Sequence, residues 1–140
     1  MVSLKRFFAL IILIVSLAAG TTLVFGAEAR VIAYYFHGNA RCLTCHKMEQ
    51  YTKEAIRENF ESELADGSLI VKTVNVEEKE NEHYIEGYQL YTKSLIISRV
   101  ENGKETQYKN LTKIWEYVRD KNRFFDYVTA EINNYLKDSQ

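Results

Sequence analysis

RVIAYYFHGNARCLTCHKMEQY, from Arg30 to Tyr51, joins a run of β-branched and aromatic residues to an amphipathic segment and contains both cysteines of the chain. Residues 30–37 include no strand breaker, which is typical of a strand buried on both faces. Gly38-Asn39 is a turn signal, and apolar residues recur at helical spacing from Cys42 onward. The segment therefore predicts a strand, a turn and a helix that begins at the first cysteine.

The motif Cys42-Leu43-Thr44-Cys45-His46 fits two different chemistries. C-x-x-C beside a strand-helix-strand pattern is typical of a thiol-disulfide redox pair, whereas C-x-x-C-H is the attachment signal for c-type haem. The five residues do not choose between the two, so the choice depends on the rest of the chain.

The helix that begins at Cys42 is expected to continue to Leu64, because its apolar residues recur three and four positions apart. Asp66-Gly67 ends it, and residues 69–76, LIVKTVNV, form a second strand. This order predicts a right-handed crossover with parallel pairing of the two strands. The apolar helix positions are Cys45, Met48, Thr52, Ala55, Ile56, Phe60 and Leu64.

The remainder of the chain predicts a short helix, a hairpin and a final helical region. The short helix lies near His83 to Leu90, and SLIISRV, Ser94 to Val100, is typical of a strand. Asn102-Gly103 is a strong hairpin signal, and the returning strand passes through Glu105 to Tyr108. Two apolar stripes follow, formed by Leu111, Ile114, Trp115 and Val118, and by Phe124, Phe125, Val128, Ile132 and Leu136.

The composition is that of an ordinary globular protein with one domain. The chain has 140 residues, of which 26% are charged and 46% apolar. Its formal net charge is -1, and Lys and Arg are scattered among Glu, so no nucleic-acid partner is expected.

The first 29 residues are expected to be a signal peptide or an N-terminal membrane anchor, and residues 30–140 the folded domain. Lys5 and Arg6 precede an uncharged apolar run, Phe7 to Phe25, and Ala27-Glu28-Ala29 resembles a cleavage site. An apolar helix of that length spans about 28 Å, nearly enough to cross a bilayer. The run is also longer than the roughly 7 to 15 residues usual for the middle of a signal peptide, which favours a retained anchor. The basic residues keep the N-terminus inside, so the domain is predicted to be exported, in the periplasm or at the outer face of the membrane.

Redox chemistry explains the two cysteines better than structural stabilisation does. Disulfides form in exported compartments. The stabilisation by a disulfide grows with the loop that it closes, and this one would enclose only two residues.

The order β-α-β-α-β-β-α, with C-x-x-C at the start of the first helix, resembles the thioredoxin fold over nearly all of Arg30 to Leu136. The resemblance implies an α/β domain with a central mixed four-stranded sheet flanked by helices, preceded here by the N-terminal apolar helix. More narrowly, the C-L-T-C-H motif, the SLIIS strand and the tail from Tyr108 to Leu136 resemble the ArsF-type family of thioredoxin-like proteins. That family is described as a nitrophenyl-compound nitroreductase subunit and is associated with aromatic arsenicals.

Cys42 is expected to be the nucleophile and Cys45 the resolving thiol. At a helix N-terminus, free N–H groups and the helix dipole stabilise a thiolate, which lowers the pKa of the cysteine below its ordinary value. Cys45 lies one turn further along, on the buried stripe, where it can attack a mixed disulfide on Cys42. Arg41 adds a positive charge, and His46 either assists the thiolate or is an ordinary exposed helical histidine.

Several features of the thioredoxin family are missing from this chain. Arg41 replaces the tryptophan that usually precedes the first cysteine, and the first strand has no acid to accept the proton of Cys45. The chain has no proline, so the loop that carries the family's cis-proline is aligned with Lys93 or Ser94. A trans peptide is expected there, because a non-proline cis bond costs about 2.5–4 kcal/mol. In the family that proline shapes the substrate groove and discourages metal binding.

The haem interpretation is disfavoured, no metal site is expected, and no cofactor is expected beyond the cysteine disulfide. Haem c would need a second axial ligand from His37, Met48 or His83, and Met48 is too close to the motif along the same helix. Zinc is disfavoured because Cys45 and His46 point in different directions from a helix. Arsenic(III) is a chemically reasonable ligand of the dithiol.

The sequence thus predicts an extracytoplasmic thiol-disulfide oxidoreductase or electron-relay subunit whose partners are protein thiols or disulfides. A reducing role would need electrons from a membrane thiol carrier, and the family resemblance suggests a multi-pass membrane protein. The alternative is a non-catalytic exported binding module whose C-x-x-C-H motif holds haem c, a metal or an arsenical.

Overall fold

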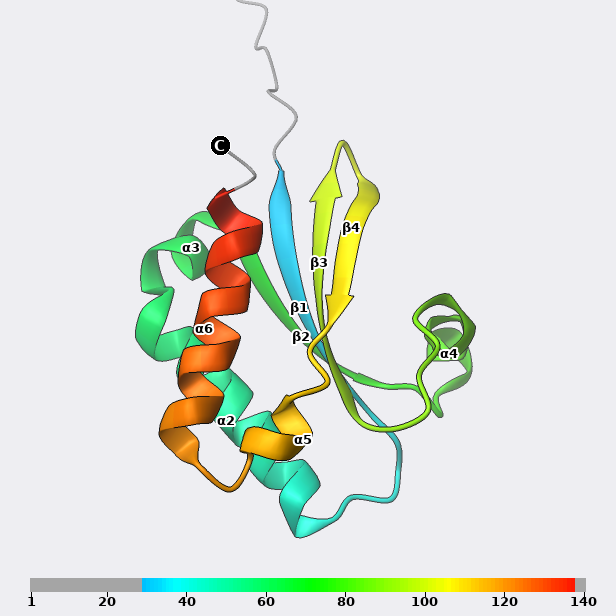
Figure 1. Ribbon diagram of the computed structural model, residues 1–140. Coiled ribbons are helices and arrows are strands. Elements are labelled where there is room, and N and C mark those ends of the chain that lie inside the picture. The colour runs from blue at the N-terminus through cyan, green and yellow to red at the C-terminus, as the bar shows by residue number, and fades with distance from the viewer. Residues whose placement is uncertain (1–28, 138–140) are drawn as a thin grey trace, which may run out of the picture.

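A mixed four-stranded sheet lies at the centre of the domain (Figure 1). The structure is a computed structural model that describes residues 29–137. In the strand order β2-β1-β3-β4, β1 pairs in parallel with β2 and antiparallel with β3, which pairs antiparallel with β4. A parallel crossover followed by an antiparallel hairpin is the thioredoxin topology, so the predicted α/β fold class is confirmed. The strands are β1 (Arg30–His37), β2 (Leu69–Asn75), β3 (Ser94–Glu101) and β4 (Lys104–Asn110).

β1 occupies the middle of the sheet because both of its faces are apolar. Residues 31–36 are all buried. Side chains alternate between the faces of a strand, so the odd-numbered residues join the main core and the even-numbered residues join a second apolar cluster. With β2 on one side and β3 on the other, β1 is a rigid support for the segment that follows it.

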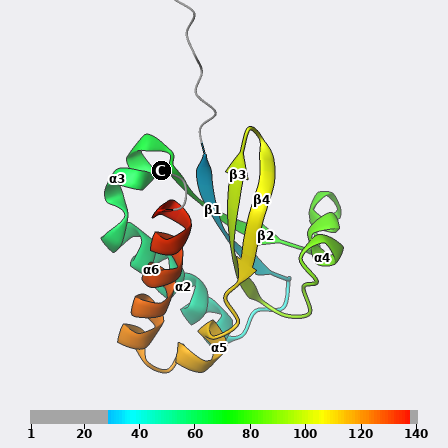
Figure 2. The same ribbon diagram turned by 45° about the horizontal axis from the view of Figure 1, so that its top comes forward.

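Two long helices, α2 (Leu43–Asn59) and α6 (Lys121–Lys137), cover the face of the sheet that carries the main core (Figures 1 and 2). Their buried stripes also meet each other. The Tyr51 ring of α2 packs edge-on against Phe124 of α6, with 5.6 Å between the ring centroids. The position of α2 relative to the sheet therefore depends on α6 as well as on β1.

The helix expected over residues 42–64 is interrupted at Phe60. α2 ends at Asn59, and the short helix α3 (Glu61–Asp66) begins after Phe60, whose φ of -136° and ψ of 40° are not helical. The Phe60 side chain is buried in the main core, so the change of direction keeps the ring packed. Helical spacing predicted the apolar positions correctly, but it contained no signal for this break.

The other face of the sheet is covered at one end by a segment that contains the 3-10 helix η1 (Lys79–Asn81) and α4 (His83–Gly87) (Figure 1). Tyr84 and Tyr88 of this segment contact Tyr34 and Phe36 of β1, with ring centroids 5.1–6.2 Å apart. These aromatic contacts attach the segment to the sheet.

The β3–β4 hairpin forms at the predicted position. Asn102 and Gly103 have φ values of 54° and 75°, the positive angles that a two-residue type I′ turn requires. A short helix, α5 (Ile114–Tyr117), precedes α6. Trp115 is 39% exposed and is not part of a buried stripe as expected, because its indole N–H turns to the carbonyl of Lys93, 3.1 Å away.

The apolar run of residues 7–25, expected to be a signal peptide or membrane anchor, lies outside the described residues. Between residues 29 and 137, no helix combines the length and the apolar character that crossing a bilayer requires.

Candidate redox site at the start of helix α2

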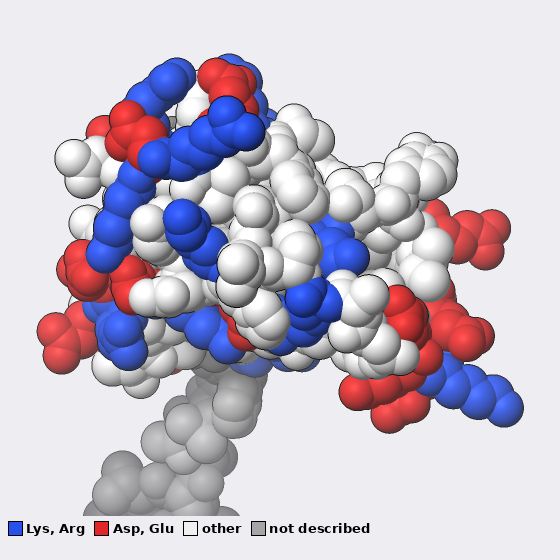
Figure 3. Space-filling model, turned by 90° about the horizontal axis from the view of Figure 1, so that it is seen from below, with Lys and Arg blue, Asp and Glu red and all other residues white. Residues whose placement is uncertain are grey.

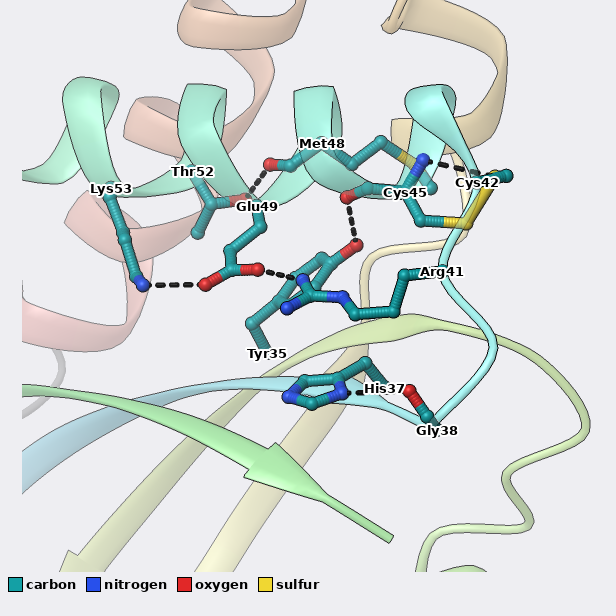
Figure 4. Close-up of polar contacts among 10 residues, drawn as sticks. All are labelled: Tyr35, His37, Gly38, Arg41, Cys42, Cys45, Met48, Glu49, Thr52 and Lys53. Atoms are coloured by element: carbon teal, nitrogen blue, oxygen red, sulfur yellow. Dashed lines mark hydrogen bonds and ion pairs between the residues drawn. A yellow bond between two sulfur atoms is a disulfide. The ribbon is translucent and has the colours of Figure 1, made fainter. Parts of the chain in front are cut away.

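The two cysteines lie where the chain passes from β1 into α2, and they are joined in a disulfide (Figure 4). Their Cα atoms are 5.1 Å apart. Cys42 has an extended backbone and is the N-cap residue of α2, and its Sγ accepts a hydrogen bond from the N–H of Cys45 at 3.2 Å. The motif thus occupies the first turn of the helix.

The cysteines differ in exposure. Cys42 is exposed, whereas Cys45 is 2% exposed and lies on the buried side of α2 with Met48. A second molecule that approaches the disulfide can therefore reach Cys42 but not Cys45.

The start of α2 favours a negative charge at Cys42. The first N–H groups of a helix have no intrahelical partners, and the positive end of the helix dipole lies there. The first turn of α2 contains no acidic residue that would oppose this effect. Once the disulfide is opened, the Cys42 thiolate is stabilised by its position.

The place of Arg41 in the sequence suggested that its charge would lie beside Cys42. In the structure its charge is directed elsewhere. Its side chain runs under α2, away from Cys42, and its guanidinium pairs with Glu49 (Figure 4). Glu49 also pairs with Lys53, with 2.6 Å between Oε1 and Nζ. The side chains of Arg41 and Glu49 are only 22% and 13% exposed, so the guanidinium is directed to a partly buried carboxylate that it shares with Lys53.

His46 lies on the exposed side of α2. Its backbone N–H donates to the carbonyl of Cys42 at 3.1 Å and closes the first helical turn. Its imidazole has no hydrogen bond to Cys42 among the contacts of the described residues, and in this geometry it is an exposed helical histidine.

Lys93 and Ser94 form the entry to β3 at the same end of the domain. Ser94 is 4% exposed and lies opposite Phe36 in the antiparallel register, and its hydroxyl donates to the Thr92 carbonyl at 3.0 Å. Every peptide bond in the described part of the chain is trans, as expected for the Lys93–Ser94 bond. The Lys93 carbonyl accepts the Trp115 indole N–H, so α5 holds this loop in place.

The residues considered as further haem or metal ligands lie on three different elements, β1, α2 and α4. Met48 is fully buried in the core, and His83 lies on α4, with its ring centroid 4.1 Å from that of Tyr84. His37 ends β1, beside a cavity of about 150 Å³ between β1, Val76-Glu77 and the loop before β3. Within residues 29–137 no three His, Cys, Asp or Glu side chains are grouped as a metal site requires.

Tyr35 is a site residue that the sequence reasoning missed. Its side chain is 1% exposed, and its hydroxyl donates to the carbonyl oxygen of Cys45 at 2.7 Å (Figure 4). Burial raises the pKa of Tyr35 to about 12, although the nearby Arg41 cation opposes this effect. The phenol is therefore protonated at neutral pH and acts as a donor. The alternation of β1 was the available signal, because it places Tyr35 on the face that α2 covers.

Comparison with known proteins yields structural likenesses only. No protein-family model matches the chain, and no curated protein is similar to it in sequence. Among solved structures, it is similar to thioredoxin from Fasciola hepatica, with 19% identity, 64% of this chain and 79% of that chain covered, and a TM-score of 0.39. It is also similar to the germline-specific thioredoxin Deadhead of Drosophila melanogaster, with 14% identity, 67% of this chain and 80% of that chain covered, and a TM-score of 0.42. The likeness to thioredoxin of Trypanosoma brucei brucei has 13% identity, covers 88% of this chain and 85% of that chain, and has a TM-score of 0.40.

The fold is assigned from the sheet topology. Structural likenesses with TM-scores this low carry no information about activity. The domain combines a thioredoxin-like fold with a disulfide in a C-x-x-C motif at the start of its first long helix. This combination supports a role in thiol-disulfide exchange.

Proposed function

We propose that this protein is an extracytoplasmic thiol-disulfide oxidoreductase or electron-relay subunit, with Cys42 as nucleophile and Cys45 as resolving thiol. The observation that carries the proposal is the unequal exposure of the bonded cysteines: Cys42 is the exposed N-cap of α2, and Cys45 is buried behind it. Attack by or on Cys42 needs access from outside, whereas resolution by Cys45 needs only proximity to Cys42.

The exchange takes two steps in the reducing direction. The Cys42 thiolate attacks a partner disulfide, which forms a mixed disulfide and releases one partner thiolate. The Cys45 thiolate then attacks the Cys42 sulfur, which forms the Cys42–Cys45 disulfide and releases the second partner thiolate. Two electrons pass from the dithiol to the partner, and the two thiol protons end on the partner's thiols. An oxidising role is the same sequence in reverse.

The surface at this end of the domain fits a protein partner. Leu43, between the cysteines, is 90% exposed, and Tyr91, in the loop before β3, is 92% exposed. Figure 3 views this end from below: acidic residues gather on the side of α4, and a largely uncharged area with a few Lys and Arg lies in the middle. Exposed apolar side chains are typical of surfaces that bind other proteins, which favours a protein as the thiol or disulfide partner.

An exchange assay with the full-length protein tests the proposal. Wild-type protein is expected to accelerate the reduction of a protein disulfide by dithiothreitol at least about tenfold over the Cys42→Ser, Cys45→Ser double variant. Its visible spectrum, recorded on the same sample, is expected to show no haem absorption. Equal rates for the two proteins would refute the oxidoreductase and favour the non-catalytic binding module.

The reduction potential of the same protein assigns the direction of transfer. A value near that of thioredoxin, about -270 mV, would indicate a reductant, and one near about -120 mV an oxidant. For a reducing role we propose a multi-pass membrane thiol carrier as the electron source. The narrower resemblance to the ArsF-type family suggests that the relay serves nitroaromatic or arsenical chemistry. Cells that lack the protein should then lose reduction of a nitrophenyl compound.

We further propose that residues 7–25 stay attached and hold the domain at the outer face of the membrane. The basic residues before the apolar run and its length of nineteen residues support this proposal. The mass of the protein from its native membrane fraction should correspond to the uncleaved chain. A mature N-terminus near Ala27 or Arg30 would show that the segment is a cleaved signal peptide.

A further inference from the structure

Tyr35 joins β1, a central strand of the sheet, to the buried cysteine. In the sheet register it lies opposite Thr73 of β2 and Leu95 of β3, so its backbone is held from both sides. Its hydroxyl reaches across the interface between sheet and helix and donates to the Cys45 carbonyl at 2.7 Å (Figure 4). The bond links residues ten positions apart in the chain.

The position of Cys45 needs such a support because it lies in the first turn of α2. Other hydrogen bonds of this turn run from the Cys45 N–H to the Cys42 Sγ and from the His46 N–H to the Cys42 carbonyl, and helix ends fray. In the mixed disulfide, the Cys42 sulfur is bonded to the partner, so the bond between Cys42 and Cys45 is absent. The Cys42 Sγ then also lacks the negative charge that it carries as a thiolate. The Tyr35 bond involves neither sulfur and therefore persists through the reaction.

The chemistry of the phenol suits a constant role. Because the pKa of Tyr35 is raised to about 12 by burial, its hydroxyl remains a donor over the whole range in which cysteine thiols titrate. A hydroxyl that donates a hydrogen bond to a main-chain carbonyl does not change the charge of the site. Its effect is to restrict where the Cys45 backbone, and with it the Cys45 sulfur, can lie.

We infer that Tyr35 is the positioning residue for the resolving step. It holds Cys45 where its thiolate can attack the sulfur of Cys42 in the mixed disulfide, which raises the effective concentration of one sulfur at the other. This inference rests on the proposed exchange function. The step itself forms the Cys42–Cys45 bond, breaks the bond from Cys42 to the partner, and releases the electron pair on the partner's thiolate.

The two steps of the reaction with oxidised glutathione separate positioning from general damage. In Tyr35→Phe, the rate of attack by Cys42 on glutathione disulfide is expected to stay within about twofold of wild type. Release of glutathione from the mixed disulfide is expected to slow about three- to tenfold, the range that one lost hydrogen bond accounts for. The mixed disulfide should accumulate, and mass spectrometry of acid-quenched samples measures both steps.

Tyr34→Phe is the matched control. Tyr34 is the neighbouring residue of β1 and is also buried, but it faces the second apolar cluster, so its variant should keep the wild-type rates of both steps. If Tyr35→Phe does not fold, 4-fluorophenylalanine at position 35 fills the space of the hydroxyl without donating and should show the same slow release.

The outcomes distinguish this inference from the proposed function. Wild-type protein that does not react with glutathione disulfide contradicts the proposed function itself. Wild-type exchange with an unchanged release rate in the Tyr35 variants shows that Tyr35 does not position Cys45. An equal slowing of both steps also overturns the inference, because it indicates a general loss of structure.

Discussion

Cys42→Ser is expected to lower the rate of disulfide exchange by on the order of a thousandfold or more, whereas Cys45→Ser should retain the first attack and lose only turnover. A serine hydroxyl is not ionised near neutral pH and cannot replace a thiolate at the exposed N-cap of α2. Cys45 is 2% exposed, so it cannot take over the attack on a bulky partner. The two variants should therefore lose different steps: Cys42→Ser loses the first attack, and Cys45→Ser loses the release of the partner.

The measurement is the mass of each variant after incubation with a disulfide-bonded protein, together with the rate of alkylation against pH. Cys45→Ser should accumulate as a mixed disulfide, because no second thiol can release the partner. Cys42→Ser should remain free. In the reduced wild-type protein, Cys42 should be alkylated faster than Cys45 and at lower pH.

Cys45→Ala controls for the cost of placing a polar serine in the buried site. Like Cys45→Ser, it should trap partners through Cys42. Removal of the disulfide itself should change the unfolding free energy little, because the loop encloses two residues. Equal trapping by the Cys42 and Cys45 variants, or faster alkylation of Cys45, would show that the roles are assigned incorrectly.

Phe124→Ala is expected to lower the free energy of unfolding by about 3–5 kcal/mol, the usual cost of removing a fully buried aromatic ring. Phe124 of α6 is 0% exposed and packs edge-on against Tyr51 of α2. A domain of this size is stable by about 5–15 kcal/mol in total. The substitution should therefore remove a large fraction of the total stability and loosen the helix that carries the cysteines.

Phe125→Ala is the matched control, since it removes the same side chain from the next position of the same helix. Phe125 also meets Tyr51 edge-on, with 6.0 Å between the ring centroids, but it is only partly buried, and the Lys121 Nζ lies 4.8 Å from its ring centroid. Its loss should cost about 1 kcal/mol or less. Urea unfolding followed by circular dichroism gives both values.

A milder variant keeps the stability prediction measurable when the alanine variant does not fold. Phe124→Leu retains most of the apolar volume and should cost about 1–2 kcal/mol. Equal losses in the alanine variants of Phe124 and Phe125 would show that Phe124 is not the more deeply packed of the two rings, contrary to its burial in the structure.

Local patterns in the sequence were sufficient to predict the order of the elements and the location of the cysteine pair. The apolar run of β1, the helical spacing from Cys42 onward and the Asn102-Gly103 turn each reflect backbone preferences of residues close together in the chain. The C-x-x-C spacing likewise placed both cysteines in one helical turn. These features depend on short-range physics, and the sequence determined them by itself.

The environment of the cysteines was decided by the tertiary structure. The sequence placed Arg41 beside Cys42, but in the folded domain its charge is paired with Glu49. The alternation of β1 indicates the face on which Tyr35 lies but not its hydrogen-bond partner. The packing of α2 on β1 brings the Tyr35 hydroxyl to the carbonyl of Cys45. Trp115, expected in a buried stripe, instead holds the loop of Lys93 across 22 positions of the chain. Periodicity predicts which face a side chain occupies, but a hydrogen bond also requires the distance between two elements, and only their packing determines that distance.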